Sequence, residues 1–235
     1  MNPHVIWHDI ECGRYSADLP LWRELAREAA GPVLDVGAGA GRVALELARA
    51  GHDVTALDID AELLAVLRER AGRLPVKSLV ADAAAFDAGE AAFGLVAVPM
   101  QTVQLLPDRR GFFASARRAV APGGLVALAI AETLERFEDE AELPPPDAGE
   151  IGGWRFLSQP TAVREVAGGT RIERLRHTIA PGGERTTEPD AVTLTAVTVA
   201  GLHAEGAAAG LRPSGALEIG PTAEHVGSEV VLLRG

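Results

Sequence analysis

The sequence predicts one α/β domain in which helices cover both faces of a largely parallel sheet. Its strand-like segments, such as residues 32–37 and 94–100, are apolar throughout instead of alternating with polar residues, as strands buried on both faces are. Segments with a helical spacing of apolar residues separate many of these strands. The 235 residues, 47% of them hydrophobic, are enough to bury one sizeable core.

The first half of the chain runs strand and helix in turn, with short connections. The expected strands are residues 32–37, 53–58, 76–82, 94–100 and 125–130. The expected helices are residues 40–51, 61–72 and 108–120. Glycines suited to a C-cap, Gly51 and Gly72, close the first two helices. Right-handed crossovers between such strands give a doubly wound fold.

Beyond residue 130 the pattern changes. Residues 138–153 are acidic and rich in proline and glycine, which predicts a loop. Three later segments alternate polar with apolar or β-branched residues between glycine turns, at residues 161–169, 170–183 and 190–199. This alternation predicts a small antiparallel β meander with one face in solvent. The expected closing elements are a helix and two strands, at residues 199–211, 217–219 and 229–233.

Charge and cysteine content narrow the class of protein. The formal net charge of −11 is spread along the chain, which argues against a nucleic-acid or anionic-membrane partner, because phosphate binding needs clustered Lys and Arg. The single cysteine, Cys12, cannot form an internal disulfide, which suits a reducing compartment. The first residues show no signal-peptide pattern, and no apolar run approaches the roughly 20 residues of a membrane span. We therefore expect a cytoplasmic protein.

The stretch VLDVGAGAGR, residues 33–42, joins a strand to a helix through a turn of glycine and alanine. Such a turn lets backbone amides approach a polar ligand at the helix start. A phosphate-binding P-loop is excluded, since Arg42 and Val43 follow the turn where Lys and Ser or Thr are required. A dinucleotide fingerprint is incomplete, because arginine stands at its sixth position.

Four motifs together resemble the class I S-adenosylmethionine-dependent methyltransferases. They are VLDVGAGAGR, ALDID, LVADAAAFD and AVAPGGLVALAI, in the order and spacing of that family, between residues 33 and 130. The resemblance implies a Rossmann-like seven-stranded sheet in which only the last strand is antiparallel. It also implies one methyltransferase domain over residues 1–235, with a helical cap at residues 1–30. The loop and meander insertion, residues 131–198, would lie over the active site.

The resemblance implies S-adenosyl-L-methionine as cofactor and a set of residues that hold it. The expected contacts are Asp35, Val36, Gly37, Ala38, Gly39, Gly41, Arg42, Asp58, Ile59, Asp82, Ala83, Pro99, Met100 and Gln101. Within this set Asp35 orients the amino-acid end and Asp58 accepts from the ribose diol. Ile59 covers the adenine face, Asp82 and Ala83 meet the adenine edge, and residues 99–101 lie along the methionine and its methyl group.

Two of these assignments have a plain structural alternative. Asp58 is also placed to cap the helix that begins near Ala61. Arg42 is at least as suited to pair with a nearby carboxylate as to touch a ligand. The scattered His, Cys and Asp residues form no ligand set typical of a metal site, so no metal is expected.

The stretch at residues 7–25 resembles the N-terminal cap of small-molecule members such as glycine and aminosugar N-methyltransferases. In those enzymes an early tyrosine lies near the acceptor, which makes Tyr15 a candidate catalytic residue. His177, in the expected meander, is the second candidate. The tetrapeptide VPMQ, residues 98–101, replaces the NPPY type of the DNA- and protein-modifying enzymes, and no basic stripe is present. The expected acceptor is a small molecule.

The sequence therefore predicts a transferase that moves a methyl group by in-line displacement to a small-molecule acceptor, with nitrogen and oxygen both open. One alternative keeps the cofactor fold but cyclises or isomerises a natural product without transferring the methyl group. Two further alternatives are a nicotinamide dehydrogenase, which the incomplete fingerprint disfavours, and a non-catalytic binding module. The oligomeric state is open.

Overall fold

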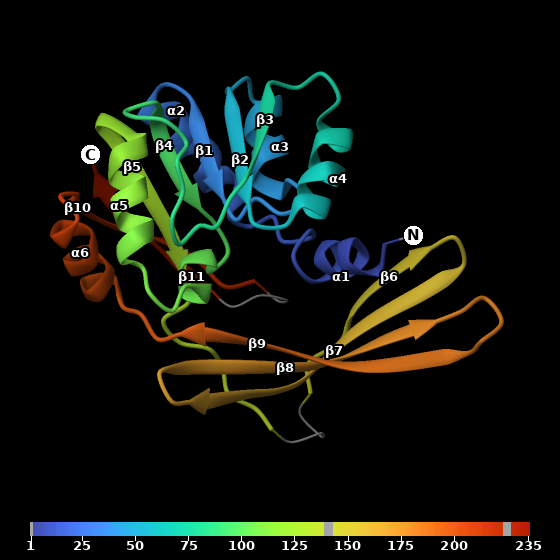
Figure 1. Cartoon of the computed structure of the whole chain (residues 1–235). Helices are drawn as coiled ribbons and strands as arrows, with labels where there is room; N and C mark the ends of the chain where they lie inside the picture. Colours follow the sequence, from blue (N-terminus) through green and yellow to red (C-terminus); the bar gives the residue numbers. More distant parts are fainter. Residues whose placement is uncertain (1, 139–142, 223–226) are drawn as a thin grey trace. The chain divides into compact units, whose positions relative to one another are not determined.

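The computed structural model describes residues 2–138, 143–222 and 227–235, and divides into two compact units (Figure 1). The larger unit comprises Tyr15–Glu132 and Val197–Gly235. The smaller unit comprises Met1–Arg14 and Thr133–Ala196. Residues 1–30, expected to form one helical cap, are thus divided between the two units. Within the described ranges, no helix combines the length and apolar character of a membrane span.

The larger unit is built on a seven-stranded sheet with the order β10-β11-β5-β4-β1-β2-β3. Its strands are β1 (Val33–Val36), β2 (Val54–Asp58), β3 (Val76–Val80), β4 (Phe93–Val98), β5 (Val120–Ile130), β10 (Arg212–Ile219) and β11 (Ser228–Arg234). Strands β1 to β5 pair in parallel, whereas β11 runs antiparallel to both β5 and β10. The predicted sheet, with its last strand antiparallel, is confirmed.

Helices cover both faces of this sheet, as Figure 1 shows. One face carries α2 (Leu19–Ala29), α3 (Arg42–Arg49) and α4 (Ala61–Ala71); the other carries α5 (Arg110–Ala119) and α6 (Val199–Ala208). A short 3-10 helix, η1 (Thr102–Leu105), follows β4. Neighbouring residues of β1 show the division: Val33 belongs to the first core and Leu34 to the second. Because each central strand contributes side chains to a core on both faces of the sheet, its residues are apolar throughout.

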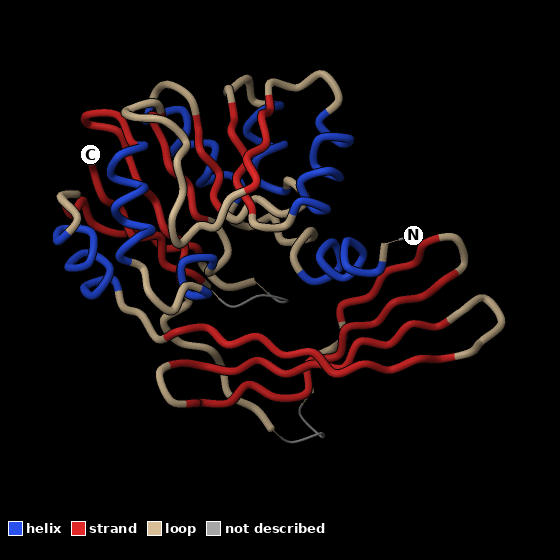
Figure 2. The backbone as a smooth tube through the Cα atoms, in the orientation of Figure 1, coloured by secondary structure: helices blue, strands red, loops and turns tan. Residues whose placement is uncertain are grey.

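The smaller unit is a four-stranded antiparallel sheet with the order β6-β7-β8-β9 and one helix, α1 (Pro3–Glu11) (Figure 2). Its strands are β6 (Asp147–Ile151), β7 (Trp154–Val166), β8 (Gly169–Ile179) and β9 (Arg185–Thr195). The predicted antiparallel meander is confirmed. The prediction of a loop over residues 138–153 is wrong for β6, and residues 139–142 lie outside the described part.

Strand β6 escaped the sequence pattern because backbone pairing, not side-chain alternation, defines it. Gly152 and Gly153 have φ of +58° and +81°, so they turn the chain tightly enough for β6 to pair with β7. Along β6, Gly149 pairs with Phe156 and Ile151 with Trp154. The glycines that suggested a loop therefore make a hairpin turn.

Helix α1 is fixed to this sheet by an apolar contact and by charge. The rings of Trp7 and Phe156 meet edge to face, 5.4 Å between centroids. Glu11 pairs with Arg174 and Arg176 at 2.9 and 2.7 Å and accepts from Ser158. Burial raises the pKa of Glu11, but these partners outweigh it and hold the pKa below its usual value. The charge on Glu11 is thus stabilised by its contacts.

Candidate functional site

The carboxyl ends of β1 to β4 gather at one edge of the larger sheet. The sheet order changes direction beside β1, which lies between β2 and β4 while the chain passes from β3 to β4 across it. Open α/β sheets bind ligands in the crevice at such a switch point. All fourteen expected cofactor contacts, residues 35–39, 41–42, 58–59, 82–83 and 99–101, lie at or beside these strand ends.

The glycine turn after β1 needs its glycines for both conformation and space. Gly37, Gly39 and Gly41 have φ of +75°, +52° and +97°, in the left-handed region. A Cβ atom on Gly37 would lie 2.5 Å from Thr102 Cγ2, and one on Gly41 2.8 Å from Leu67 Cγ. A side chain at position 37 would therefore collide with Thr102, and one at position 41 with Leu67.

Asp58, at the end of β2, fastens the turn to the sheet. Its Oδ2 accepts from the amide of Gly39 at 2.7 Å, and its Oδ1 accepts from the amide of Asp60 at 2.9 Å. Helix α4 is capped by Asp60, which accepts from the amides of Glu62 and Leu63. The alternative in which Asp58 caps this helix is therefore wrong. Each Asp58 oxygen keeps a second lone pair, which suits the two hydroxyls of a ribose.

Asp35 is an acid buried without a well-formed hydrogen bond. Its exposed fraction is 1%, and neither carboxylate oxygen meets hydrogen-bond geometry within the described residues. Burial raises its pKa to about 7, although the charge of Arg42 and the amide of Ala44 lower it. The charges of Asp58 and Asp18 raise the pKa further. A ligand with N–H donors would supply what this carboxyl lacks.

Arg42 is committed to a buried ion pair. Its guanidinium donates to both oxygens of Asp18, at 2.6 and 2.8 Å, and to the carbonyl of Tyr15 at 2.9 Å. It also lies over the Tyr15 ring, 5.3 Å from the centroid, and Trp22 Nε1 donates to the same aspartate. The pairing that the sequence left open for Arg42 is the one observed. Its contact with a cofactor stays a prediction.

The ends of β2 and β3 present exposed apolar side chains. Ile59 is 69% exposed and Val80 is 54% exposed, the highest values among the large hydrophobic residues. Asp82 is exposed, with one oxygen accepting from the amide of Ala84 at 2.8 Å, and Ala83 is half-buried. An exposed isoleucine beside Asp58 suits the flat face of an adenine, with Asp82 at its edge. Val80 was missed from sequence, since a strand valine is ordinarily core.

The connection after β4 holds two consecutive non-glycine residues in the left-handed region. Met100 and Gln101 have φ of +47° and +57°, a conformation that costs roughly 1–2 kcal/mol per residue. Thr102 stabilises this bend, because its hydroxyl donates to the carbonyl of Pro99 at 2.8 Å. Strain of this kind persists where the surroundings enforce it, commonly at ligand sites. Neither the strain nor Thr102 was visible in the sequence.

The two candidate catalytic residues belong to different units. Tyr15, in the larger unit, is 7% exposed; burial and the charge of Asp18 raise its pKa, while a hydrogen bond with Ser228 lowers it. His177, in β8, is 8% exposed, and its Nδ1 lies 2.9 Å from Thr187 Oγ1. Burial and the charge of Arg185 lower the pKa of His177. Both roles stay predictions.

Residues 33–124 match the family model described as Methyltransferase domain. This span begins at the first residue of β1 and includes the glycine turn, Asp58 and the strained bend after β4. Over these residues the chain is similar to methyltransferases. The resemblance to class I enzymes drawn from the four motifs is confirmed: residues 33–124 match the family model and supply β1 to β4 and part of β5 of the sheet described above.

Sequence relatives include methyltransferases. The chain is 33% identical over 124 residues to the ubiquinone biosynthesis O-methyltransferase of Paramagnetospirillum magneticum, 52% of this chain and 48% of that protein. It is 36% identical over 96 residues to an uncharacterized methyltransferase of Mycobacterium tuberculosis, 41% of this chain and 48% of that one. The matches thus span about half the length of these relatives.

Solved structures resemble the chain over nearly its whole length, both units included. CalS10, an amino pentose methyltransferase from Micromonospora echinaspora solved with S-adenosylmethionine, has a TM-score of 0.74 at 23% identity, covering 98% of this chain and 97% of its own. The sugar N-methyltransferase KedS8 from Streptoalloteichus has a TM-score of 0.75 at 18% identity, covering 100% and 94%. At such identities the likeness shows the fold alone.

Proposed function

We propose that this protein transfers a methyl group from S-adenosylmethionine to an amine on a small, sugar-like molecule. The methyltransferase domain supports the reaction class. The observation that carries the proposal is Asp35, a buried acid just before the glycine turn whose oxygens make no well-formed hydrogen bond within the described residues. A cofactor with a charged amino-acid end supplies the missing partner, which a purely structural carboxyl would not need.

The described residues fit this cofactor at three points. Asp35 receives the ammonium of the amino-acid end, Asp58 accepts from the ribose hydroxyls, and Ile59 covers the adenine. The bound cofactor brings a methyl group that its positively charged sulfur already activates. The chain's residues therefore bind, align the acceptor and exclude water.

An amine acceptor fits the described residues better than a hydroxyl. Methylation of a hydroxyl needs a general base, whereas a neutral amine attacks without one. Tyr15 is buried with a raised pKa, which disfavours its ionised form near neutral pH. Two structural neighbours that match nearly the whole chain, an amino pentose methyltransferase and a sugar N-methyltransferase, point the same way.

The test is product analysis with a panel of acceptors. Purified protein and S-adenosylmethionine are incubated with amino sugars and, as matched controls, with the same sugars carrying a hydroxyl in place of the amine. Mass spectrometry then follows S-adenosylhomocysteine and a 14-dalton gain on the acceptor, the mass of the added CH₂. Methylation of the amine alone supports the proposal. Conversion of an acceptor without S-adenosylhomocysteine supports the cyclisation or isomerisation alternative.

A further inference from the structure

We propose that Gln104 is a positioning residue for the methyl-donor end of this site. Its side-chain amide holds the left-handed pair Met100–Gln101 against the end of β5. The inference rests on the proposed function for the identity of the ligand. It concerns a residue outside the expected contacts.

Gln104 is a buried amide with both ends engaged. It is 3% exposed; its Nε2 donates to the carbonyl of Ala131 at 3.1 Å, and its Oε1 accepts from the amide of Ala131 at 2.8 Å. Ala131 directly follows β5 and is itself buried. One side chain thus satisfies both backbone groups of the residue at the strand end, as a pairing strand would.

The same residue is bonded to the strained bend. The backbone amide of Gln104 donates to the carbonyl of Gln101 at 2.8 Å, so η1 begins at the left-handed pair. The path from Met100–Gln101 to the sheet is therefore short: one backbone bond to Gln104 and two side-chain bonds to Ala131. A strained bend relaxes when the contacts that enforce it are removed.

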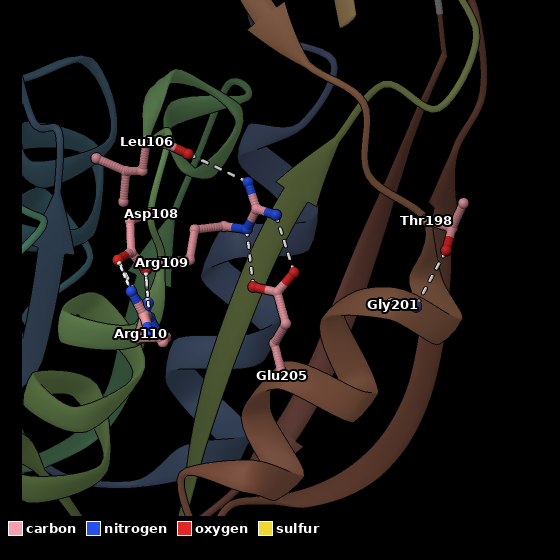
Figure 3. A network of polar contacts seen from close by, with 7 residues as sticks. All are labelled: Leu106, Asp108, Arg109, Arg110, Thr198, Gly201 and Glu205. Atoms are coloured by element: carbon pink, nitrogen blue, oxygen red, sulfur yellow. Dashed lines mark hydrogen bonds and ion pairs between the residues drawn. The ribbon is translucent and has the colours of Figure 1, made fainter. Parts of the chain in front are cut away.

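A second anchor holds the far end of the same connection and offers a matched control. Arg109 donates to the carbonyl of Leu106 at 3.1 Å and makes two bonds to Glu205 of α6, at 2.9 and 2.8 Å, which Figure 3 shows. Glu205 is 38% exposed, so water replaces this partner readily. Arg109 lies eight positions beyond Gln101 in the sequence, and its bonds described here are to Leu106 and Glu205.

The experiment compares Gln104→Met, Gln104→Glu and the control Arg109→Gln. Three quantities are measured: amide hydrogen exchange over residues 99–106, the Kd for S-adenosylhomocysteine, and the melting temperature. We expect Gln104→Met to speed exchange in this segment and to weaken binding about tenfold or more, because small misplacements are costly. Arg109→Gln is expected to leave the Kd within about threefold.

Gln104→Glu provides a rescue that a merely structural role would not show. A protonated glutamic acid donates and accepts at the same two atoms as glutamine, whereas the ionised form only accepts. The affinity of Gln104→Glu for S-adenosylhomocysteine, compared with that of wild type at the same pH, should therefore improve as the pH falls from 8 towards 5.5. This variant also decides the question if Gln104→Met does not fold.

Two results would overturn the inference: a folded Gln104→Met variant with unchanged exchange and Kd, or exchange that rises evenly across the chain. If wild-type protein binds no S-adenosylhomocysteine, the proposed function fails. The exchange comparison over residues 99–106 still decides whether Gln104 positions the bend.

Discussion

Two connections at the same edge of the sheet, the turn after β1 and the bend after β4, each carry an energetic cost of a different kind. The turn at residues 37–41 adopts left-handed backbone through glycines, which do so freely, but buries the acid Asp35 beneath it. The bend contains no glycine and forces Met100 and Gln101 into the left-handed region. In the turn the energetic cost is electrostatic, because a carboxyl group is buried. In the bend the cost is backbone strain.

This contrast explains why only the turn could be recognised from the sequence. Glycine at a left-handed position is a residue choice, so the turn could be read from VLDVGAGAGR. The bend after β4, by contrast, is held in our proposal by a contact distant in sequence, that between Gln104 and Ala131, 27 positions apart. A cost that tertiary contacts impose leaves no local signal.

The largest expected effect concerns Asp35 and changes stability. Its pKa of about 7 in the folded protein exceeds the unfolded value, so the folded state favours the neutral acid; this stability is complete below about pH 4 and is lost as pH rises to about 7. Asp35→Asn removes the dependence. Denaturant unfolding should show it gaining about 3 kcal/mol over wild type between pH 5 and 8, at about 1.4 kcal/mol per pH unit up to 7.

The prediction would be contradicted if the free energies of unfolding of wild type and Asp35→Asn changed in parallel with pH. The groups that act on Asp35 are Arg42 of α3, Asp58 of β2 and Asp18 before α2. Asp35→Asn is further expected to bind S-adenosylhomocysteine more weakly, since the amide lacks the charge that receives an ammonium.

The second prediction separates clash from backbone strain in the glycine turn. Gly37→Ala places a Cβ atom 2.5 Å from Thr102, whereas Gly51→Ala, at a φ of +94°, meets nothing within 4 Å. Both variants lose roughly 1 kcal/mol of stability to conformation. Only Gly37→Ala should weaken binding of S-adenosylhomocysteine, by about 100-fold. Equal affinity in the two folded variants would remove the turn from the site.

The third prediction tests Asp58 against its neighbour Asp60. Asp58→Ala should weaken cofactor binding roughly 10- to 100-fold, because charge-assisted hydrogen bonds contribute about 1.5–3 kcal/mol. Asp58→Asn should lose less, and Gly39→Val should abolish binding in a folded protein. Asp60→Ala removes the cap of α4 and leaves Asp58 in place, so it should lower stability by about 1 kcal/mol with affinity unchanged. Calorimetry and a melt of each variant check this; equal affinities would assign Asp58 a structural role.

The smallest expected effect measures the strain in the bend. Gln101→Gly relieves a left-handed side chain and should raise the free energy of unfolding by about 0.5–1 kcal/mol. Gln101→Ala keeps the Cβ atom and therefore the strain, so it serves as the control. Denaturant unfolding of both variants gives the difference. A glycine variant less stable than the alanine variant would show that the bend is not strained.

Most of the sheet, and the edge of it that holds the site, could be predicted from the sequence. Buried parallel strands and glycine turns leave periodic patterns, so β1 to β5 and the closing hairpin were predicted. The hairpin β6–β7 was missed in part, because its first strand is defined by its pairing with β7 across the turn at Gly152 and Gly153. The exposure of Val80 and the bonds between Gln104 and Ala131 depend on three-dimensional neighbours, which a single sequence does not give.

Our main proposal is that an S-adenosyl cofactor binds at this edge with the ammonium of its amino-acid end on Asp35. Calorimetric titration of wild type and Asp35→Asn with S-adenosylhomocysteine at pH 7, in two buffers of different ionisation enthalpy, tests it directly. The account predicts binding with proton release in wild type, because Asp35 ionises against the ammonium, and no such release in the variant. Heat from NAD with none from S-adenosylhomocysteine, or equal proton release in both proteins, would contradict it.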